Sequence, residues 1–169
     1  MGANISRPAA DARVVLDAVR WIVQAIRESS RRAERTVGLS GAQLFVLRAI
    51  AETPALSLNQ LARRTRTHQS SVSVVVSRLV RRRLVRRERS ADDRRRLVLG
   101  LTASGAALVA RSPDVVQERL IAAIERQPRR RRQALATALG GLAAAVAGGR
   151  RHPPMFLDGP ERRARTRRG

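Results

Sequence analysis

A run of short and hydrogen-bonding side chains occupies residues 67–78, inside a segment whose apolar residues recur at helical spacing. Four apolar residues from Val72 to Leu79 fall on one face of the predicted helix and leave the other face polar. Gln binds adenine edges, Ser and Arg bind phosphates or bases, and a valine methyl contacts thymine. A solvated helix face is the alternative. The DNA-reading interpretation predicts contacts from Thr67, His68, Gln69, Ser70, Ser71, Ser73, Val74, Ser77 and Arg78.

Arginine gathers directly after this helix. Six of the nine positions from 81 to 89 are arginine, and a second group, Arg94 to Arg96, lies at the tip of a predicted hairpin. Most charge runs are only solvated surface. This run adjoins both a polar helix face and a charged hairpin tip, which suits contacts with phosphates beside a DNA groove. Arg94, Arg95 and Arg96 are therefore further candidate DNA contacts.

The whole composition favours a polyanionic partner. The 169 residues carry a formal charge of +22, and all 35 basic residues are arginine. Nucleic acid fits this field first and an anionic membrane second. Single-strand and RNA modules stack bases on aromatic side chains, but only Trp21, Phe45 and Phe156 are aromatic, so duplex DNA is the better partner.

Several other classes of function lack the residues they need. Cysteine is absent, and no His, Cys or carboxylate cluster has metal-ligand spacing. No nucleophile–base pair or glycine-rich phosphate loop occurs, so neither an enzyme nor a bound cofactor is expected. An apolar run of about 18 residues is also missing, as is a signal peptide. A soluble, cytoplasmic protein without a membrane partner is predicted.

The predicted elements place the polar helix in a helix-turn-helix. A long amphipathic helix over 11–35 ends at Gly38, and Ser40 with Gln43 forms a capping box for a second helix that Pro54 closes. A second box, Ser57 with Gln60, starts a short helix, and a polar turn leads into the helix near 68–82. Strands at 84–89 and 97–101 then form the hairpin. From the short helix, Ser57 and Asn59 join the candidate DNA contacts.

The C-terminal third is predicted to form helices followed by a basic tail. A helix begins near Thr102, and Ser112 with Pro113 predicts an N-cap and first-turn proline where it restarts. Pro128 opens the last helix. Residues 150–169 are too polar for a core and predict a flexible basic extension. The expected domains are 1–36 for dimerisation, 37–105 for DNA binding, 106–149 for dimerisation and 150–169 as the tail.

One motif resembles a known family. Asp93-Arg94-Arg95, followed after five residues by Leu101-Thr102-Ala103-Ser104-Gly105, is similar to the wing signature of the MarR-type winged-helix transcriptional regulators. The resemblance covers about residues 11–148. It implies a mainly α fold with a small β-hairpin wing, plus a helical dimerisation domain. It also implies that Arg95 contacts the DNA backbone or minor groove and that Asp93 braces the wing, although Asp93 also suits a simple turn.

The chain departs from that family pattern at two positions. Arg83 stands where glycine is frequent, so the helix end is expected to lack the usual left-handed cap. Val74 stands where arginine is frequent, which predicts a different operator sequence.

The resemblance further implies a symmetric homodimer on a pseudo-palindromic operator. It also implies a small aromatic effector between the dimerisation helices and the winged domain. The predicted function is a ligand-responsive repressor of nearby genes. A non-specific nucleic-acid packaging or RNA-associated protein is the alternative. An aromatic acid would suit a wall of aromatic and arginine side chains, although ordinary core is the simpler interpretation of the two aromatic residues. The candidate effector residues are Arg20, Trp21, Gln24, Phe45 and Arg48.

Overall fold

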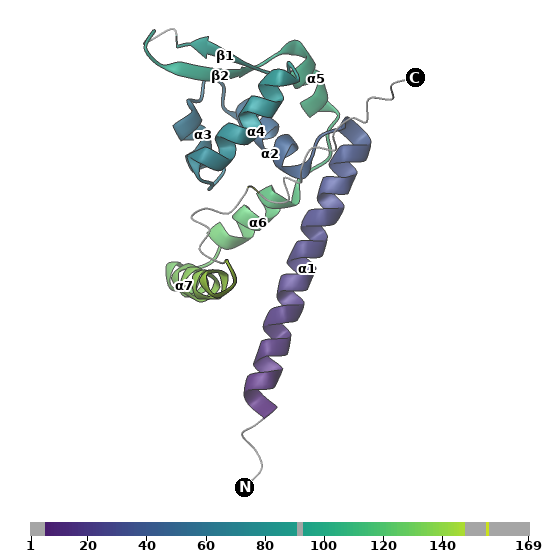
Figure 1. Cartoon of the computed structure of the whole chain (residues 1–169), viewed down its shortest axis with the longest axis vertical. Coiled ribbons are helices and arrows are strands. Elements are labelled where there is room, and N and C mark those ends of the chain that lie inside the picture. Colours follow the sequence, from purple (N-terminus) through teal and green to yellow (C-terminus); the bar gives the residue numbers. More distant parts are fainter. Residues whose placement is uncertain (1–5, 91–92, 148–154, 156–169) are drawn as a thin grey trace.

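The computed structural model describes residues 6–90, 93–147 and 155. A lobe of short helices and one hairpin stands at the end of a long helix, α1 (Ser6–Val37), which extends away from it (Figure 1). Two further helices, α6 (Val116–Glu125) and α7 (Arg129–Val146), lie on the same side of the lobe as α1. The predicted tail, 150–169, lies outside the described residues except for Met155, which is buried in the core.

The lobe contains α2 (Gly41–Glu52), α3 (Leu58–Arg64), α4 (Gln69–Arg81), β1 (Val85–Arg89), β2 (Leu97–Leu101) and α5 (Ala103–Ala110). Both predicted capping boxes are present. Ser40 accepts a hydrogen bond from the Gln43 amide, and Ser57 accepts one from the Gln60 amide. In each box the glutamine side chain accepts from the backbone N–H of the capping serine. These caps begin α2 and α3 at the predicted positions because they satisfy otherwise free amides of the first turn.

The hairpin pairs β1 with β2 in antiparallel register, with Val85 opposite Leu101 and Arg89 opposite Leu97. A single bridge adds Leu56 to the other edge of β2, where the Leu99 amide donates to the Leu56 carbonyl at 2.8 Å. This bridge was not predicted. It ties the hairpin to the loop before α3, so the wing has a fixed base.

One apolar core joins the helices of the lobe. The largest fully buried apolar side chains come from the end of α1 through β1, and they are Leu39, Leu44, Val46, Leu47, Ile50, Leu61, Val72, Val75, Val76, Leu79 and Val85. The predicted inner face of α4 is therefore confirmed. Burial of this face holds the opposite face outward.

The two helices α3 and α4 both end in the same way. After α3, the Thr67 amide donates to the Ala62 carbonyl and Arg66 has a φ of 52°. After α4, the Leu84 amide donates to the Leu79 carbonyl and Arg83 has a φ of 56°. This is the Schellman pattern, with a left-handed residue just beyond the helix. The expectation that Arg83 removes the left-handed cap is wrong, because arginine itself adopts this conformation.

Arg83→Gly is expected to stabilise the protein. The left-handed conformation costs a residue with a Cβ about 1 kcal/mol, and glycine adopts it freely, although glycine also gains entropy in the unfolded chain. We expect a net gain of up to about 1 kcal/mol in the free energy of unfolding, measured by urea denaturation. The comparison variant is Arg82→Gly, at a φ of −80°, which should destabilise because glycine gains entropy in the unfolded chain and because the hydrogen bond from Arg82 to the Gly38 carbonyl is lost. Equal effects of the two changes would contradict the assigned conformation.

The connection between α5 and α6 corrects one prediction. A helix does restart there, but α6 begins at Val116 with Val115 as N-cap, rather than with Ser112 as N-cap and Pro113 in the first turn. The Ser112 hydroxyl instead donates to the Val109 carbonyl at 2.8 Å. The Val116 amide donates to Ser29 of α1 at 3.1 Å, so a distant serine satisfies the start of α6. The next residue, Ser30, accepts from the Gly41 amide at the start of α2.

The helix α7 begins after Pro128, as predicted, but none of its side chains is buried. The helix ends at Val146, with Ala147 as its C-cap. Within the described part of the chain, no helix has both the length and the apolar character that crossing a membrane would require.

Candidate DNA-binding surface

The outer face of α4 presents the side chains predicted to read DNA. Gln69, Ser70 and Ser77 are exposed, and Val74 is 50% exposed. Ser71, Ser73 and Arg78 are half-buried. His68 is exposed at the N-cap position, before the first turn of α4. The structure thus brings the predicted residues of this helix onto one outward surface of suitable chemistry.

Two arginines hold α4 in place at its C-terminal end. The guanidinium of Arg82 donates to the Gly38 carbonyl at 2.7 Å, which ties the end of α4 to the end of α1. The guanidinium of Arg87, on β1, donates to the Ser77 hydroxyl at 3.4 Å and so connects the hairpin to the outer face of α4. Both contacts join residues distant in sequence. The sequence marked these arginines only as part of a charge run.

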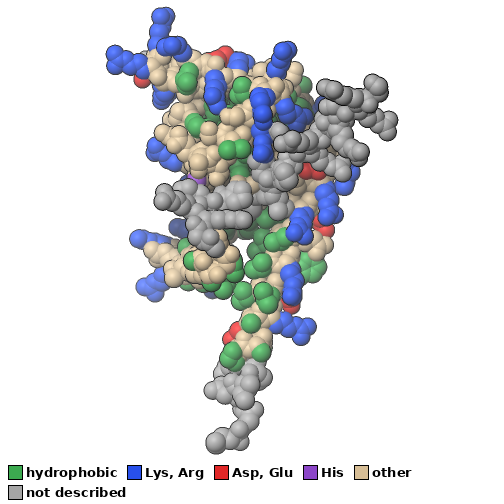
Figure 2. Space-filling model, viewed as in Figure 1, with side chains coloured by type: hydrophobic (Ala, Val, Ile, Leu, Met, Phe, Trp, Pro, Cys, Tyr) green, Lys and Arg blue, Asp and Glu red, His purple; other side chains and the backbone are tan. Residues whose placement is uncertain are grey.

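The hairpin tip forms a basic wing. Arg94, Arg95 and Arg96 are exposed there, and Figure 2 shows basic side chains around this end of the hairpin. The Asp93 carboxylate accepts a hydrogen bond from the Arg95 amide at 2.9 Å, and the Arg94 carbonyl accepts one from the Arg89 guanidinium. Asp93 therefore forms the turn through the backbone, which leaves the guanidinium of Arg95 directed to solvent for a polyanion.

The structure explains why the wing signature ends in threonine and glycine, Thr102 and Gly105. Thr102 caps α5 by accepting from the Gly105 amide at 3.0 Å, while its hydroxyl donates to the Arg83 carbonyl. A Cβ added at Gly105 would lie 2.1 Å from the carbonyl oxygen of Leu84. Glycine is required at this position because the backbone of α5 passes so close to the link between α4 and β1.

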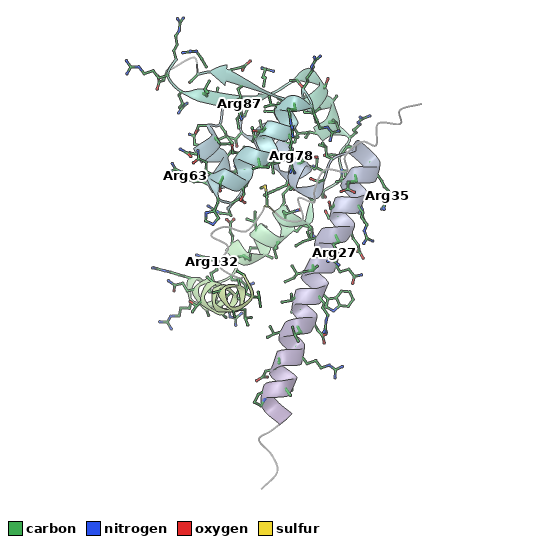
Figure 3. All side chains as sticks on the ribbon, viewed as in Figure 1. Arg27, Arg35, Arg63, Arg78, Arg87 and Arg132 are labelled. Atoms are coloured by element: carbon green, nitrogen blue, oxygen red, sulfur yellow. The ribbon has the colours of Figure 1, made fainter. Side chains whose placement is uncertain are left out.

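An open groove accompanies the turn of the helix-turn-helix. It has a volume of about 630 Å³ and is lined by Asn59, Ala62, Arg63, Arg66, Thr67 and His68. Asn59 and His68 are exposed, whereas Ser57 is half-buried because it caps α3. Arg63 is not among the contacts predicted from the sequence. Figure 3 shows Arg63, Arg78 and Arg87 in the same lobe, while Arg27 and Arg35 lie along α1. Arg63 adds a cation beside the predicted contacts of α3 and the turn.

The five predicted effector residues are not brought together in one cavity. Arg20 and Gln24 line an open groove along α1, and Trp21 is 70% exposed on that helix. Phe45 is buried in the lobe, and Arg48 binds Glu118 at 2.8 Å. The hydrogen bond to Glu118 raises the pKa of Arg48, while burial opposes this rise. Trp21 is therefore not core in this chain, whereas Phe45 is.

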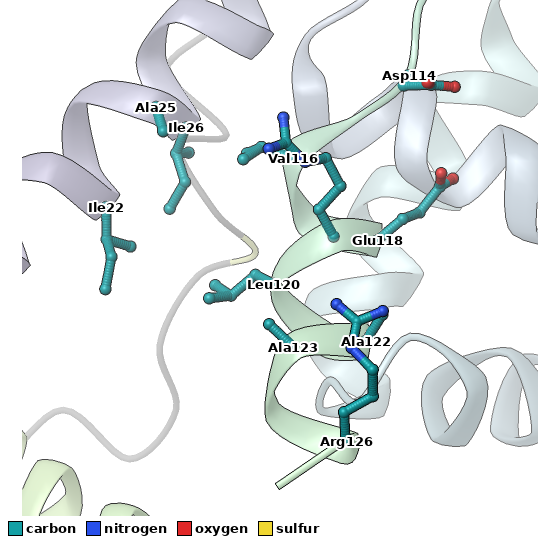
Figure 4. A pocket seen from close by; sticks show the side chains of 11 residues that line it. Ile22, Ala25, Ile26, Asp114, Val116, Glu118, Leu120, Ala122, Ala123 and Arg126 are labelled. Atoms are coloured by element: carbon teal, nitrogen blue, oxygen red, sulfur yellow. The ribbon is translucent and has the colours of Figure 1, made fainter.

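A different cavity lies between α1 and α6. It has a volume of about 570 Å³, and Figure 4 shows Ile22 and Ile26 of α1 facing Leu120 and Ala123 of α6, with Arg126 at the end of α6. None of the five predicted effector residues lines it. The described residues hold no group of three or more His, Cys, Asp or Glu side chains arranged for a metal ion.

This geometry defines a winged helix-turn-helix protein. Residues 37–96, which include α2 to β1 and the hairpin tip, match the model of the MarR family. The resemblance predicted from the wing signature is confirmed over that segment.

Two relatives support the assignment. The chain is 32% identical over 100 residues to a protein of Thauera aromatica named as a transcriptional regulatory protein for the hcr operon. It is 30% identical over 84 residues to the HTH-type transcriptional repressor MdtR of Bacillus subtilis. The aligned regions cover 59% and 50% of this chain, and 60% and 54% of the relatives. The match thus spans less than two thirds of either relative.

Solved structures confirm the fold class, mainly α with a hairpin wing. The transcriptional regulator BldR from Sulfolobus solfataricus aligns with a TM-score of 0.51 at 22% identity, covering 85% of this chain and 99% of that one. BpsR of Bordetella bronchiseptica aligns with a TM-score of 0.52 at 23% identity, over 78% and 91% of the two chains. MepR of S. aureus, in a complex with DNA, has a TM-score of 0.52 at 18% identity, over 78% and 94%.

Proposed function

We propose that this chain is a transcriptional regulator that binds specific sequences in duplex DNA. The observation that carries the proposal is one lobe with two DNA-facing elements, the polar face of α4 and the arginine wing. The helix would enter the major groove, where Gln69 and Val74 distinguish base pairs. The wing would bind phosphates or the minor groove through Arg95. Such a regulator acts on the chromosome in the cytoplasm, and the named relatives act in transcription.

The proposal includes a symmetric dimer built from α1, α6 and α7. Apolar side chains are 40–85% exposed along α1 and α7, from Val14, Val15, Leu16, Val19, Trp21 and Ile22 to Leu135, Leu139, Leu142 and Val146. Contiguous apolar surface of this extent is unfavourable in water and marks an interface. A second copy would cover both faces and place two α4 helices about one DNA turn apart, which suits a pseudo-palindromic operator.

An effector would bind in the cavity between α1 and α6. Its walls are partly apolar and also carry the carboxylates of Asp114 and Glu118, while Arg119 and Arg126 supply cations that suit a small aromatic acid. The structure of BpsR concerns regulation of its DNA binding by 6-hydroxynicotinic acid, which is chemistry of this kind. The regulatory part of the proposal is repression of nearby genes, which ends when such a compound releases the protein from its operator.

Gln69→Ala is expected to relax the sequence preference of the protein. An operator would first be selected from random duplexes, and its affinity compared with that of a scrambled duplex at fixed salt. Loss of a bidentate contact to adenine should reduce the ratio of the two affinities about tenfold. Sedimentation should show two protomers on each operator.

Gln133→Ala, on α7, makes the same change on an exposed site far from the proposed surface. It should leave the ratio unchanged. Equal affinity of the unsubstituted protein for operator and scrambled duplex would contradict specific regulation and favour non-specific packaging.

A further inference from the structure

Acidic residues are scarce in this chain, and two of them join α6 to the DNA-binding lobe. The sequence has 13 acidic residues against 35 arginines. Glu118 and Glu125 stand seven positions apart on α6, which is about two helical turns, so they share one face. Each binds an arginine of the lobe. Because acidic residues are rare in this chain, two ion pairs from one face of α6 distinguish that face from the rest of the helix.

The first pair is sheltered. The Arg48 guanidinium, on α2, lies 2.8 Å from Glu118 and 3.5 Å from Asp114, and the side chains of Arg48 and Glu118 are 21% and 30% exposed. Arg48 also donates to the Ser112 hydroxyl. Partial burial reduces screening by salt, so this contact is stronger than an open surface pair.

The second pair reaches the turn of the helix-turn-helix. Two nitrogens of Arg66 lie 3.0 Å and 2.6 Å from one carboxylate oxygen of Glu125. Arg66 is the left-handed residue that ends α3, and it directly precedes Thr67 and His68 at the start of α4. A force on Arg66 therefore acts on the first turn of the DNA-reading helix.

Apolar packing between α6 and the lobe is incomplete beside these pairs. A cavity of about 460 Å³ separates α6 from α2 and α3. Phe45, Ile121 and Ala122 form part of its walls, and Arg66, Glu118 and Glu125 also line it. On its other side α6 contacts α1, and the cavity of about 570 Å³ lies between these two helices. A close-packed interface would resist a change of angle, but a cavity does not.

We propose that Glu118 and Glu125 are positioning residues for DNA recognition. By binding Arg48 and Arg66 across the cavity, they hold the lobe at one angle to α6 and thereby determine the separation of the two α4 helices in the dimer. The separation of the two α4 helices rests on the proposed function of a dimer that binds DNA. The angle between the lobe and α6 within one chain is independent of that function.

A distance measurement within one chain tests the angle. The chain has no cysteine, so Val74→Cys on α4 and Thr137→Cys on α7 introduce unique sites for a pair of spin labels. Both positions are exposed, and Thr137 lies opposite the apolar face of α7. Dilution with unlabelled protein restricts the signal to one chain. Glu118→Gln with Glu125→Gln is expected to broaden the distance distribution at low salt.

Glu52→Gln is the matched control. Glu52 pairs with Arg64 and lines the same cavity, but this pair joins α2 to α3 inside the lobe. Glu52→Gln removes one negative charge, whereas the double variant removes two. Glu118→Gln alone and Glu125→Gln alone also remove one charge each, so comparing them with Glu52→Gln controls for overall charge. Glu52→Gln should leave the distribution narrow. Arg66→Glu should broaden it, and Arg66→Glu combined with Glu125→Arg should restore it.

A DNA experiment tests the consequence for recognition. Affinity is measured for a set of operators that differ in the length of the spacer between half-sites. Removal of each ion pair should reduce affinity for the operator with the best spacer by up to about fivefold. It should also make affinity depend less on spacer length. Equal distance distributions in the double variant, Glu52→Gln and the unsubstituted protein would overturn the inference. Absence of specific DNA binding would instead overturn the proposed function, while the distance measurement would still decide the role of the two glutamates.

Discussion

Gly105→Ala is expected to destabilise the winged helix-turn-helix lobe by about 3 kcal/mol or more. The new Cβ would lie 2.1 Å from the Leu84 carbonyl oxygen, far inside van der Waals contact. Leu84 cannot move away easily, because its amide donates to Leu79, its carbonyl accepts from Thr102, and its side chain is buried. Either the start of α5 or the join between α4 and β1 must shift. Urea denaturation followed by circular dichroism measures the destabilisation.

Gly140→Ala provides the control for this change. Gly140 lies within α7, and nothing comes within 4 Å of a Cβ built there. Alanine at an open helical site should stabilise the chain by about 0.5–1 kcal/mol. Similar free energies of unfolding for the two variants would show that the close approach at Gly105 is not rigid.

Arg95→Ala is expected to weaken binding to operator and scrambled duplex alike, by roughly tenfold, which is the effect of removing one charge-assisted hydrogen bond. Arg95 is exposed on the wing, and its own amide, rather than its guanidinium, holds the turn through Asp93. The substitution therefore removes a cation without removing the turn. The slope of log affinity against log salt should decrease by about 0.9 for each phosphate that the variant no longer neutralises. Filter binding or fluorescence anisotropy over a salt series measures both quantities.

Arg130→Ala removes the same charge from the start of α7, away from the wing. It should change the slope much less, because only long-range attraction is reduced. An unchanged affinity and salt slope in Arg95→Ala would contradict the assignment of the wing as a DNA contact.

The correct local predictions depend on residues close together in the sequence. Each capping box needs a serine and a glutamine three residues apart, and both boxes begin their helices where predicted. The inner face of α4 follows from the spacing of four apolar residues, and β1 and β2 lie within their predicted strands. Capping and helical periodicity operate within one or two turns, so the sequence is sufficient to locate them.

The errors concern backbone conformation and distant partners. Arginine disfavours a positive φ, yet Arg83 adopts one because burial of Leu84 beside Leu79 stabilises the helix end around it. Ser112 suited an N-cap, but the amide of Val116 is satisfied by Ser29, which is 87 residues away. The five residues predicted to form an effector wall lie apart for a related reason. Residue type shows that an arginine or an aromatic ring suits a ligand, but it does not show which side chains of the protein already contact that arginine or ring.

The sequence by itself therefore determined the chemistry and order of the elements proposed to face DNA: a capped helix-turn-helix, a polar outer face and an arginine wing. Only the tertiary structure decided how they are held. It showed that Arg82 binds the end of α1, that Arg48 and Arg66 bind α6, and why Gly105 must be glycine. The physical reason is that each of these contacts joins backbone or side chains from separate elements. Their distances depend on packing of the whole core rather than on spacing along the chain.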